Sequence, residues 1–351
     1  MQGREKEQKA LFGTTPLDEL LPGDHPLRKI RADFDEAYRR LESAFESSYG
    51  SAGNVSIPAP VLLRAWLLMA LYSLRSERAL CGQITMNAGF RWFVGLDWDD
   101  KVFDHSTLSK NRERLFGSGA AEALLGEVVR IAQSRRLLAS DRLVVDGTLI
   151  KAWASHKSFK ASDGSDDDRP NFKGTRRSNQ THTSRTDPDA RMIRKGPGQE
   201  SMLCHLAHAL VDSASGLVRA CRVTKACGLG GNPEVSAALE LAEEHMERGQ
   251  TLVADRGYDD ARFVRGLREQ GIRAHPRAKK GRSHLDGRTT GKASYEASMK
   301  RRFIPEPVFG WIKNRGRMGQ TMLRGTEKVD WQFHLYCIAY NLRRLERAAG
   351  S

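Results

Sequence analysis

Three carboxylates stand at positions from which a protein can hold metal ions. Asp146 ends the apolar run LVVD, Asp255 ends the apolar run TLVAD, and Glu306 lies near the start of IPEPVFGWIK. If both runs are neighbouring strands, the two Asp side chains lie at adjacent strand ends, where chemistry collects in α/β sheets. Carboxylates brought together repel one another unless a divalent cation joins them, and Mg²⁺ or Mn²⁺ suits oxygen ligands. These acids therefore predict phosphodiester chemistry, in which two ions about 3.5–4 Å apart activate a water or hydroxyl and stabilise the leaving oxygen.

Each of these acids also has an ordinary structural explanation. An Asp at the end of a strand is a common turn former, and a Glu in the first turn of a helix is favoured by the helix dipole. Asp259 and Asp260 compete with Asp255, and we interpret them as the N-cap of the next helix. The prediction of a catalytic site therefore depends on the three acids jointly and on no single one of them.

The charge of the chain favours an anionic polymer as its partner. Its 351 residues include 57 Lys and Arg against 43 Asp and Glu, which gives a formal net charge of +14. The range 273–302 alone carries ten basic residues against two acids. A solvated loop is the alternative explanation, but this imbalance is typical of a surface that binds the phosphate backbone of DNA. Lys279 and Lys280 in this range, and Arg315 and Arg317 in a second basic segment, are candidate DNA contacts.

Composition argues against a membrane or secreted protein. The mean hydropathy is −0.54 and no apolar run is long enough to span a bilayer. The charged start MQGREKEQKA lacks the apolar segment of a secretory signal. The five cysteines form no CxxC pair, which is typical of free thiols in a reducing cytosol. We therefore expect a cytoplasmic protein with no membrane partner.

The elements that must position the acids fall into two kinds of region. Residues 1–138 read as all-α, with helices expected over 17–48, 58–76, 77–94 and 119–136 and a further helix capped by Ser106 and Thr107. From residue 141 the pattern predicts a strand, a hairpin turning at 212–216, and then strands alternating with helices. This order implies an α/β domain with a mixed sheet and flanking helices. A long polar loop is expected over 156–200.

Seven stretches of the sequence together resemble one family. They are FDHSTLSKNRERL, VVDGTLIKAWAS, TDPDARMIRKG, TLVADRGYDDARFVRGLREQGI, DGRTT, IPEPVFGWIK and WQFHLYCIAYNLRRL, in the family's order over about residues 12–345. The chain resembles bacterial insertion-sequence transposases of the DDE type, and most of all the IS-five group within the IS-four superfamily. The resemblance rests on the set of stretches and on their order.

The resemblance implies a fold, a site and partners. The fold is a ribonuclease-H-like catalytic domain over residues 139–345, preceded by a helical DNA-binding and dimerisation domain over residues 1–138. The implied catalytic and metal-binding residues are Asp146, Asp255 and Glu306, with Mg²⁺ or Mn²⁺ as cofactor. The implied partners are the terminal repeats of the element and the target DNA, held by a homodimer or larger synaptic complex at the bacterial nucleoid.

The family signature around the Glu is Tyr, two residues, Arg, three residues, Glu, six residues, Lys. The chain has Arg302, Glu306 and Lys313 at these spacings, but Met299 at the Tyr position. Residues four and seven apart share one face of an α-helix, so that the acid would meet metal while both cations meet phosphates. Because proline is tolerated only in the first turn, we expect the helix to restart near Pro305, with Arg302 on the preceding turn.

Two other functions remain open at this point. A stand-alone metal nuclease on the same fold would hydrolyse DNA without joining it to a target. An inactive DNA-binding relic of a transposase would be marked by loss of one of the three acids, and none is lost here.

Overall fold

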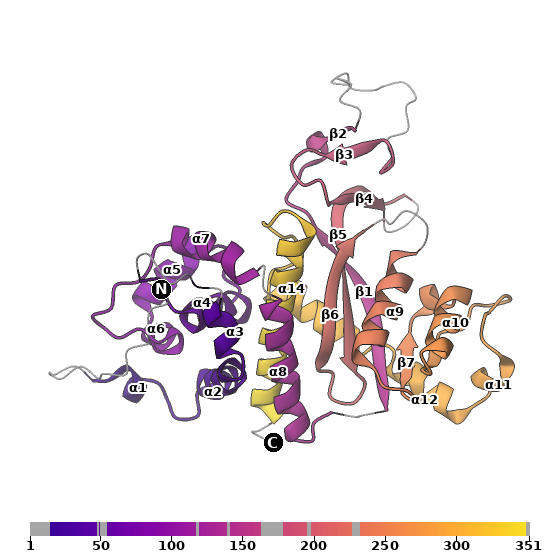
Figure 1. Cartoon of the computed structure of the whole chain (residues 1–351), viewed down its shortest axis with the longest axis horizontal. Helices are drawn as coiled ribbons and strands as arrows, with labels where there is room; N and C mark the ends of the chain where they lie inside the picture. The colour runs from indigo at the N-terminus through magenta and orange to yellow at the C-terminus, as the bar shows by residue number, and fades with distance from the viewer. Residues whose placement is uncertain are drawn as a thin grey trace. The chain divides into compact units, whose positions relative to one another are not determined.

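The computed structural model describes residues 15–47, 49, 55–116, 119–138, 141–162, 178–194, 198–226 and 232–348 (Figure 1). The chain divides into two compact units. The helical unit comprises residues 1–137, 314–317 and 334–351, and the sheet unit comprises residues 138–313 and 318–333. Residues 334–345, which we expected in the catalytic domain, fall in the helical unit because the last helix of the chain runs through both units.

The described part of the helical unit is built from α-helices, as the sequence predicts. They are α1 (Leu17–Leu20), α2 (Pro26–Arg39), α3 (Glu42–Ser47), α4 (Ala59–Leu71), α5 (Glu77–Met86), α6 (Ala88–Val94), α7 (His105–Phe116), α8 (Ala120–Ser134) and the second part of α14 (Thr326–Ala348). Helix α4 follows Pro58 and is buried on nearly every side, which confirms the expected core helix. Within the described residues, no helix has both the length and the apolarity needed to cross a membrane.

The start of α7 differs from the prediction by a short distance along the chain. The cap is Asp104, whose carboxylate accepts the N–H of Ser106 at 2.8 Å, while its carbonyl accepts the N–H of Thr107 at 2.9 Å. Ser106 and Thr107 lie inside the helix. Asp and Ser are both good N-caps, so composition alone does not decide which of several neighbouring candidates is used.

The sheet unit contains a mixed sheet, as predicted. Its strands are β1 (Arg142–Lys151), β4 (Arg191–Arg194), β5 (Ser201–Asp212), β6 (Val218–Lys225), β7 (Thr251–Ala254) and β8 (Arg273–Pro276). Strand β5 pairs antiparallel with β1, β4 and β6, whereas β1, β7 and β8 pair parallel in that order. This order, with an antiparallel hairpin on one side of β1 and parallel strands on the other, is that of a ribonuclease-H-like sheet.

Helices cover the sheet and bury its apolar side chains. Helices α9 (Pro233–His245) and α10 (Ala261–Glu269) share one core with β1 and β7, including Leu143, Val145, Leu252, Leu241 and Phe263. Figure 1 shows α9 lying along the sheet. Side chains alternate between the faces of a strand, so Leu143 and Val145 both point to the α9 face. Helices α12 (Ala293–Arg301) and α13 (Pro305–Gly310) also contact the sheet.

The expected polar loop and the basic segment both contain regular structure. Within 156–200, β2 (Phe159–Ala161) pairs with β3 (His182–Ser184), and β4 joins the main sheet. Phe159 packs with Ala152, Ala154, Ala190 and Leu203 in a small separate core, which explains why so polar a segment is ordered there. Residues 163–177 and 195–197 of this predicted loop lie outside the described residues. The basic segment 273–302 begins with β8 and then forms α11 (Gly287–Thr290) and α12.

Candidate active site

Asp146 lies at the point where β1 loses one of its two neighbours. Parallel pairing with β7 covers only Arg142–Val144 of β1, whereas antiparallel pairing with β5 continues to Lys151. The sequence had suggested that the strand ends at Asp146, but the strand continues to Lys151. Strand β7 ends at Ala254 and Asp255 follows it directly. The edge of β1 beyond the last parallel pair is open toward Asp255, which is where ligands bind in sheets of this kind.

Asp255 is exposed and has a basic neighbour. Arg302 Nε lies 3.8 Å from Asp255 Oδ1, with 16% of the Arg302 side chain exposed against 63% for Asp255. The guanidinium of Arg302 also lies 3.5 Å from the ring centroid of Phe303. Arg302 is the C-cap of α12, so it precedes the restart at Pro305, as predicted. An ion pair this long and this exposed contributes little to stability, so its interest lies in the charge it brings to the site.

Glu306 stands in the first turn of α13, which Val308 and Phe309 anchor in the core. A π-helical turn, Trp311–Arg315, follows and carries Lys313. The prediction that Arg302, Glu306 and Lys313 share one α-helical face is therefore wrong. One helix ends before Arg302, another begins at Pro305, and the wider π turn changes the spacing that seven residues would have on an α-helix.

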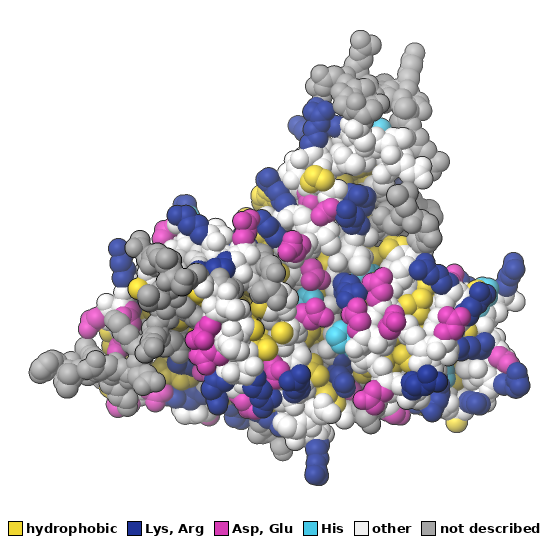
Figure 2. Space-filling model, viewed as in Figure 1, with side chains coloured by type: hydrophobic (Ala, Val, Ile, Leu, Met, Phe, Trp, Pro, Cys, Tyr) yellow, Lys and Arg dark blue, Asp and Glu magenta, His cyan; other side chains and the backbone are white. Residues whose placement is uncertain are grey.

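The other predicted DNA contacts are distributed over both units. Arg315 and Arg317 belong to the helical unit, and Lys279 and Lys280 are exposed in the sheet unit. The ammonium of Lys279 donates to the carbonyl of Asp259 at 2.6 Å. Figure 2 shows further Lys and Arg side chains over α10, α11 and α12.

Asp259 has a different role from the one its position suggests. Asp260 caps α10 by accepting the N–H of Arg262 at 2.8 Å, which confirms half of the predicted cap. The Asp259 side chain is instead fully buried and accepts the N–H groups of Lys279 at 2.7 Å and His284 at 2.9 Å. Asp259 therefore fixes the basic segment that follows β8.

The electrostatics of Asp146 link the three predicted acids. Burial is the largest effect and raises the pKa of Asp146 to about 6. The N–H of Gly147, which donates to Asp146 Oδ1 at 2.8 Å, lowers the pKa, and the charges of Glu234, Asp255 and Glu306 raise it. The structure thus brings Asp255 and Glu306 within electrostatic reach of Asp146.

Glu234 is a fourth acid that our reading of the sequence missed. It lies in the first turn of α9, where Asn232 caps the helix by accepting the Glu234 N–H at 3.1 Å. Such a Glu is ordinarily explained by the helix dipole. Its carboxylate nevertheless reaches β1, because a Cβ on Gly147 would lie 3.2 Å from Glu234 Oε1. The glycine directly after Asp146 is the one sequence signal that marked a close approach there.

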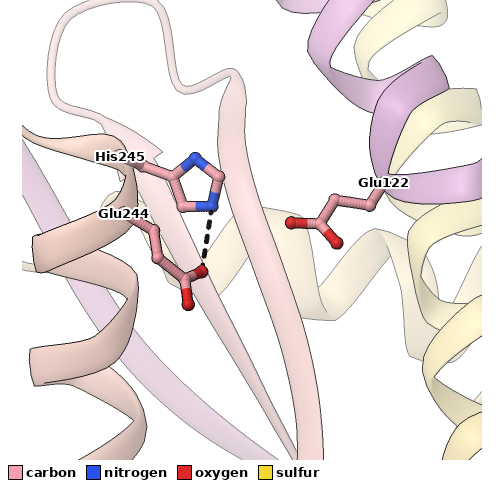
Figure 3. A group of neighbouring side chains, drawn as sticks. All are labelled: Glu122, Glu244 and His245. Carbon is pink, nitrogen blue, oxygen red and sulfur yellow. Dashed lines mark ion pairs between the residues drawn. The ribbon is translucent and has the colours of Figure 1, made fainter. Parts of the chain in front are cut away.

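Acids and histidines elsewhere in the sheet unit are engaged with other partners. At the far end of α9, His245 Nε2 lies 3.6 Å from Glu244 Oε2 (Figure 3), and Arg222 also pairs with Glu244 at 2.6 Å. Figure 3 also draws Glu122, which belongs to the helical unit, and we assign no site to that group. On β5, His205 bonds Asp187 at 2.9 Å and His208 bonds Thr224 at 2.9 Å.

The donor set beside Asp146 fits a hard divalent cation. All four acids offer carboxylate oxygens, which are the ligands that Mg²⁺ and Mn²⁺ prefer. Besides burial, the charges of the other three acids raise the pKa of Asp146, as like charges do. A mixed sheet with acids where parallel pairing ends, with Arg302 beside one of them and in a chain of net charge +14, is typical of metal-dependent enzymes that act on nucleic acids.

Comparison with known families narrows this class. The family model "Transposase domain (DUF772)" matches residues 15–114, and the model "Transposase DDE domain" matches residues 139–342, more than half of the chain. The chain belongs to the transposase DDE domain family and is an insertion-sequence DNA transposase, an enzyme that cuts and joins DNA. No curated protein matches it.

The solved structures to which the chain is similar share little sequence with it. A piggyBac transposase synaptic complex with hairpin DNA is 8% identical, with a TM-score of 0.43 over 95% of this chain and 78% of that one. A Mos1 transposase paired-end complex is 10% identical, with a TM-score of 0.21 over 80% of this chain and 87% of that one.

Proposed function

We propose that Asp146, Asp255 and Glu306 are the catalytic triad of this transposase, and that the enzyme belongs to the IS-five group of the IS-four superfamily. The observation that carries the assignment of the triad is the position of Asp146. It lies where β1 opens toward Asp255, and the charges of Asp255 and Glu306 both act on it. The spacing of Arg302, Glu306 and Lys313 supports the assignment to the group.

The three carboxylates would hold Mg²⁺ or Mn²⁺. When bound, such ions activate the attacking oxygen and stabilise the leaving oxygen of a phosphodiester. Asp146 is fixed in β1 by the antiparallel pairing with β5, and Asp255 is fixed by the end of β7. Two of the three acids are thus positioned by rigid strands, which is what a reaction that depends on positioning requires.

The chain's own residues would position two successive in-line transfers. In the first, water attacks phosphorus at an element end, the bond from phosphorus to the 3′ oxygen breaks, and the 3′ oxygen leaves with a proton. In the second, this 3′-hydroxyl attacks a phosphodiester of the target and displaces a target 3′ oxygen, so one bond forms and one breaks. Arg302 beside Asp255 would neutralise phosphate charge near the cut.

DNA would be held by basic residues of both units. We assign phosphate contacts to Arg302, Lys313, Lys279, Lys280, Arg315 and Arg317. Residues 1–138 would bind the terminal repeats and make dimer contacts, and residues 139–345 would carry out catalysis. Synapsis of two element ends requires at least a homodimer. A DNA substrate of this kind places the working enzyme at the bacterial nucleoid, in the cytoplasm.

The test of the triad is an end-joining reaction with a matched pair of variants. Purified protein is incubated with a labelled duplex carrying the element end, a supercoiled target and Mg²⁺. Asp255→Asn removes the charge at the site, and Asp260→Asn makes the same change five residues away, at a cap that Asn also serves. We expect joined product with the wild type and Asp260→Asn and none with Asp255→Asn. Cleaved but never joined ends would indicate the nuclease, and equal binding without reaction would indicate the relic.

The phosphate contacts are tested by the salt dependence of binding. Lys280→Ala should weaken binding to duplexes of any sequence and should reduce the slope of log affinity against log salt by about one. An unchanged slope would remove Lys280 from the DNA surface.

A further inference from the structure

We propose that Glu234 is a fourth carboxylate of the metal-binding site, facing the cation together with Asp146 and Asp255. This inference rests on the proposed function, because it assigns one more ligand to the same site. Glu234 comes from α9, between the predicted acids in the sequence but outside the family signature that points to them.

The first observation is the close approach of Glu234 to β1. A Cβ built on Gly147 would lie 3.2 Å from Glu234 Oε1, closer than nine in ten real Cβ contacts. Gly147 directly follows Asp146 and points to the α9 face of β1. The absence of a side chain at this position therefore leaves room for the carboxylate beside Asp146.

The second observation is that the other oxygen of Glu234 faces the segment after β7. A Cβ built on Gly257 would lie 3.9 Å from Glu234 Oε2, and Gly257 is two residues beyond Asp255. One carboxylate thus spans from the residue after Asp146 to the turn that carries Asp255. A carboxylate between Gly147 and the turn after β7 lies where it would ligate a cation shared by Asp146 and Asp255.

The third observation is the contrast between Glu234 and the other acids of α9. Glu240 and Glu244 both pair with Arg222, at 2.9 Å and 2.6 Å. The Glu234 side chain makes no ion pair with any described residue, although it is only partly exposed. Burial, and next the charge of Asp255, raise the pKa of Glu234. A partly buried carboxylate among like charges is stabilised by a cation that joins them.

Metal binding itself, and not catalysis, is the measurement that tests this assignment. Tb³⁺ is a luminescent stand-in for hard divalent cations, and aromatic side chains close to it sensitise its emission. Burial raises the pKa of Tyr258, and Tyr258 lies close enough to Glu234, Asp146 and Asp255 for their charges to raise it further. We therefore expect sensitised emission on titrating the wild type with Tb³⁺, competed by Mn²⁺ and Mg²⁺ and reduced in Tyr258→Phe.

Two variants on α9 distinguish the loss of a metal ligand from a general effect of removing one charge from the helix. Glu234→Gln keeps the size of the side chain and removes its charge, and we expect the affinity for Tb³⁺ and Mn²⁺ to fall about tenfold or more. Glu243→Gln makes the same change at an exposed position on α9 and should leave both affinities unchanged. Thermal unfolding without metal should show Glu234→Gln to be at least as stable as the wild type, because a repulsive charge has gone.

The outcomes distinguish this inference from the function on which it rests. Equal metal affinity in the wild type and Glu234→Gln would overturn the role of Glu234 and leave the triad intact. Absence of metal binding by the wild type would contradict the proposed function itself. If Glu234→Gln does not fold, Glu234→Asp takes its place. It keeps the charge but shortens the reach by one methylene, so binding should again weaken, and unchanged binding would be evidence against the assignment.

Discussion

Two sets of carboxylates in the sheet unit lie in opposite environments. Asp187 is fully buried, and it bonds His205 Nε2 at 2.9 Å and accepts the N–H of Gly325 at 3.1 Å. Asp189 pairs with Lys225 at 2.8 Å. Burial acts to raise the pKa of both acids, but these partners together lower it overall. Such carboxylates are saturated with donors and serve to hold the β4 region to the rest of the unit.

The acids at the open edge of β1 lack this saturation. The pKa of Asp146 rises to about 6, first through burial, and the charges of Glu234, Asp255 and Glu306 add to the rise. Asp255 has Arg302 at 3.8 Å, too far for a hydrogen bond. The difference teaches that an acid surrounded by donors stabilises the fold, whereas acids that act on one another through their charges do not, and we propose that the latter serve to bind a cation. Changes to the two sets should therefore have opposite effects on activity and stability.

The largest effect is expected at Asp146. Asp146→Asn should lower end joining by about 10³-fold or more, because we assign Asp146 to the catalytic triad and expect it to act at the transition state. The free energy of unfolding without metal should stay the same or rise, because one of four crowded charges is removed. An end-joining assay and denaturant unfolding of the same preparation measure both. If Asp146→Asn loses activity and stability together, Asp146 has a structural role like that of Asp187.

The reverse pattern is expected at Asp187. Asp187→Ala leaves His205 buried without its partner, so the free energy of unfolding should fall by about 3–5 kcal/mol. Denaturant unfolding measures the change, and the exposed Asp141→Ala should stay within about 0.5 kcal/mol of the wild type. If Asp187→Ala is as stable as the wild type but binds no metal, Asp187 is a metal ligand and not a structural acid.

Acidification should lower the stability of the fold through His208, a buried histidine of β5. Burial, and then the charge of Arg222, lower the pKa of His208 from 6.5 to about 4. The unfolded chain therefore binds this proton more readily than the folded one. Stability from this group is complete above about pH 6.5 and falls toward pH 4, by about 3 kcal/mol at most. Thermal unfolding across this range should show a flatter profile for His208→Gln, and an identical profile would assign the acid sensitivity elsewhere.

The smallest effect is expected at Gly147. A methyl group there would meet Glu234 Oε1 at 3.2 Å and push the flexible carboxylate aside, so metal affinity should fall about threefold. Tb³⁺ titration measures it, with Gly126→Ala, which has open space around its Cβ, as the control. A fall as large as that of Glu234→Gln would mean that the strand itself had moved.

Local pattern predicted much of this protein. Apolar periodicity gave the helices of residues 15–138 and the strands β5 and β6 with their turn. Motifs pointed to Asp146, Asp255 and Glu306 without any structure. The misses have specific causes. Strands β2 and β3 are short and polar, and they are ordered by one small core around Phe159. The π turn after α13 has no periodicity that separates it from an α-helix.

The sequence by itself determined which segments are helices or strands, because capping, proline position and side-chain periodicity act between near neighbours. It also determined that the chain is basic and that Asp146, Asp255 and Glu306 lie in stretches that follow the order of a known family. Only the tertiary structure decided which acids are surrounded by donors and which act on one another through their charges. Asp187 meets the N–H of Gly325, 138 residues away, and Glu234 meets β1 through the space left by Gly147. Such contacts depend on how strands and helices assemble, and no local rule assigns them.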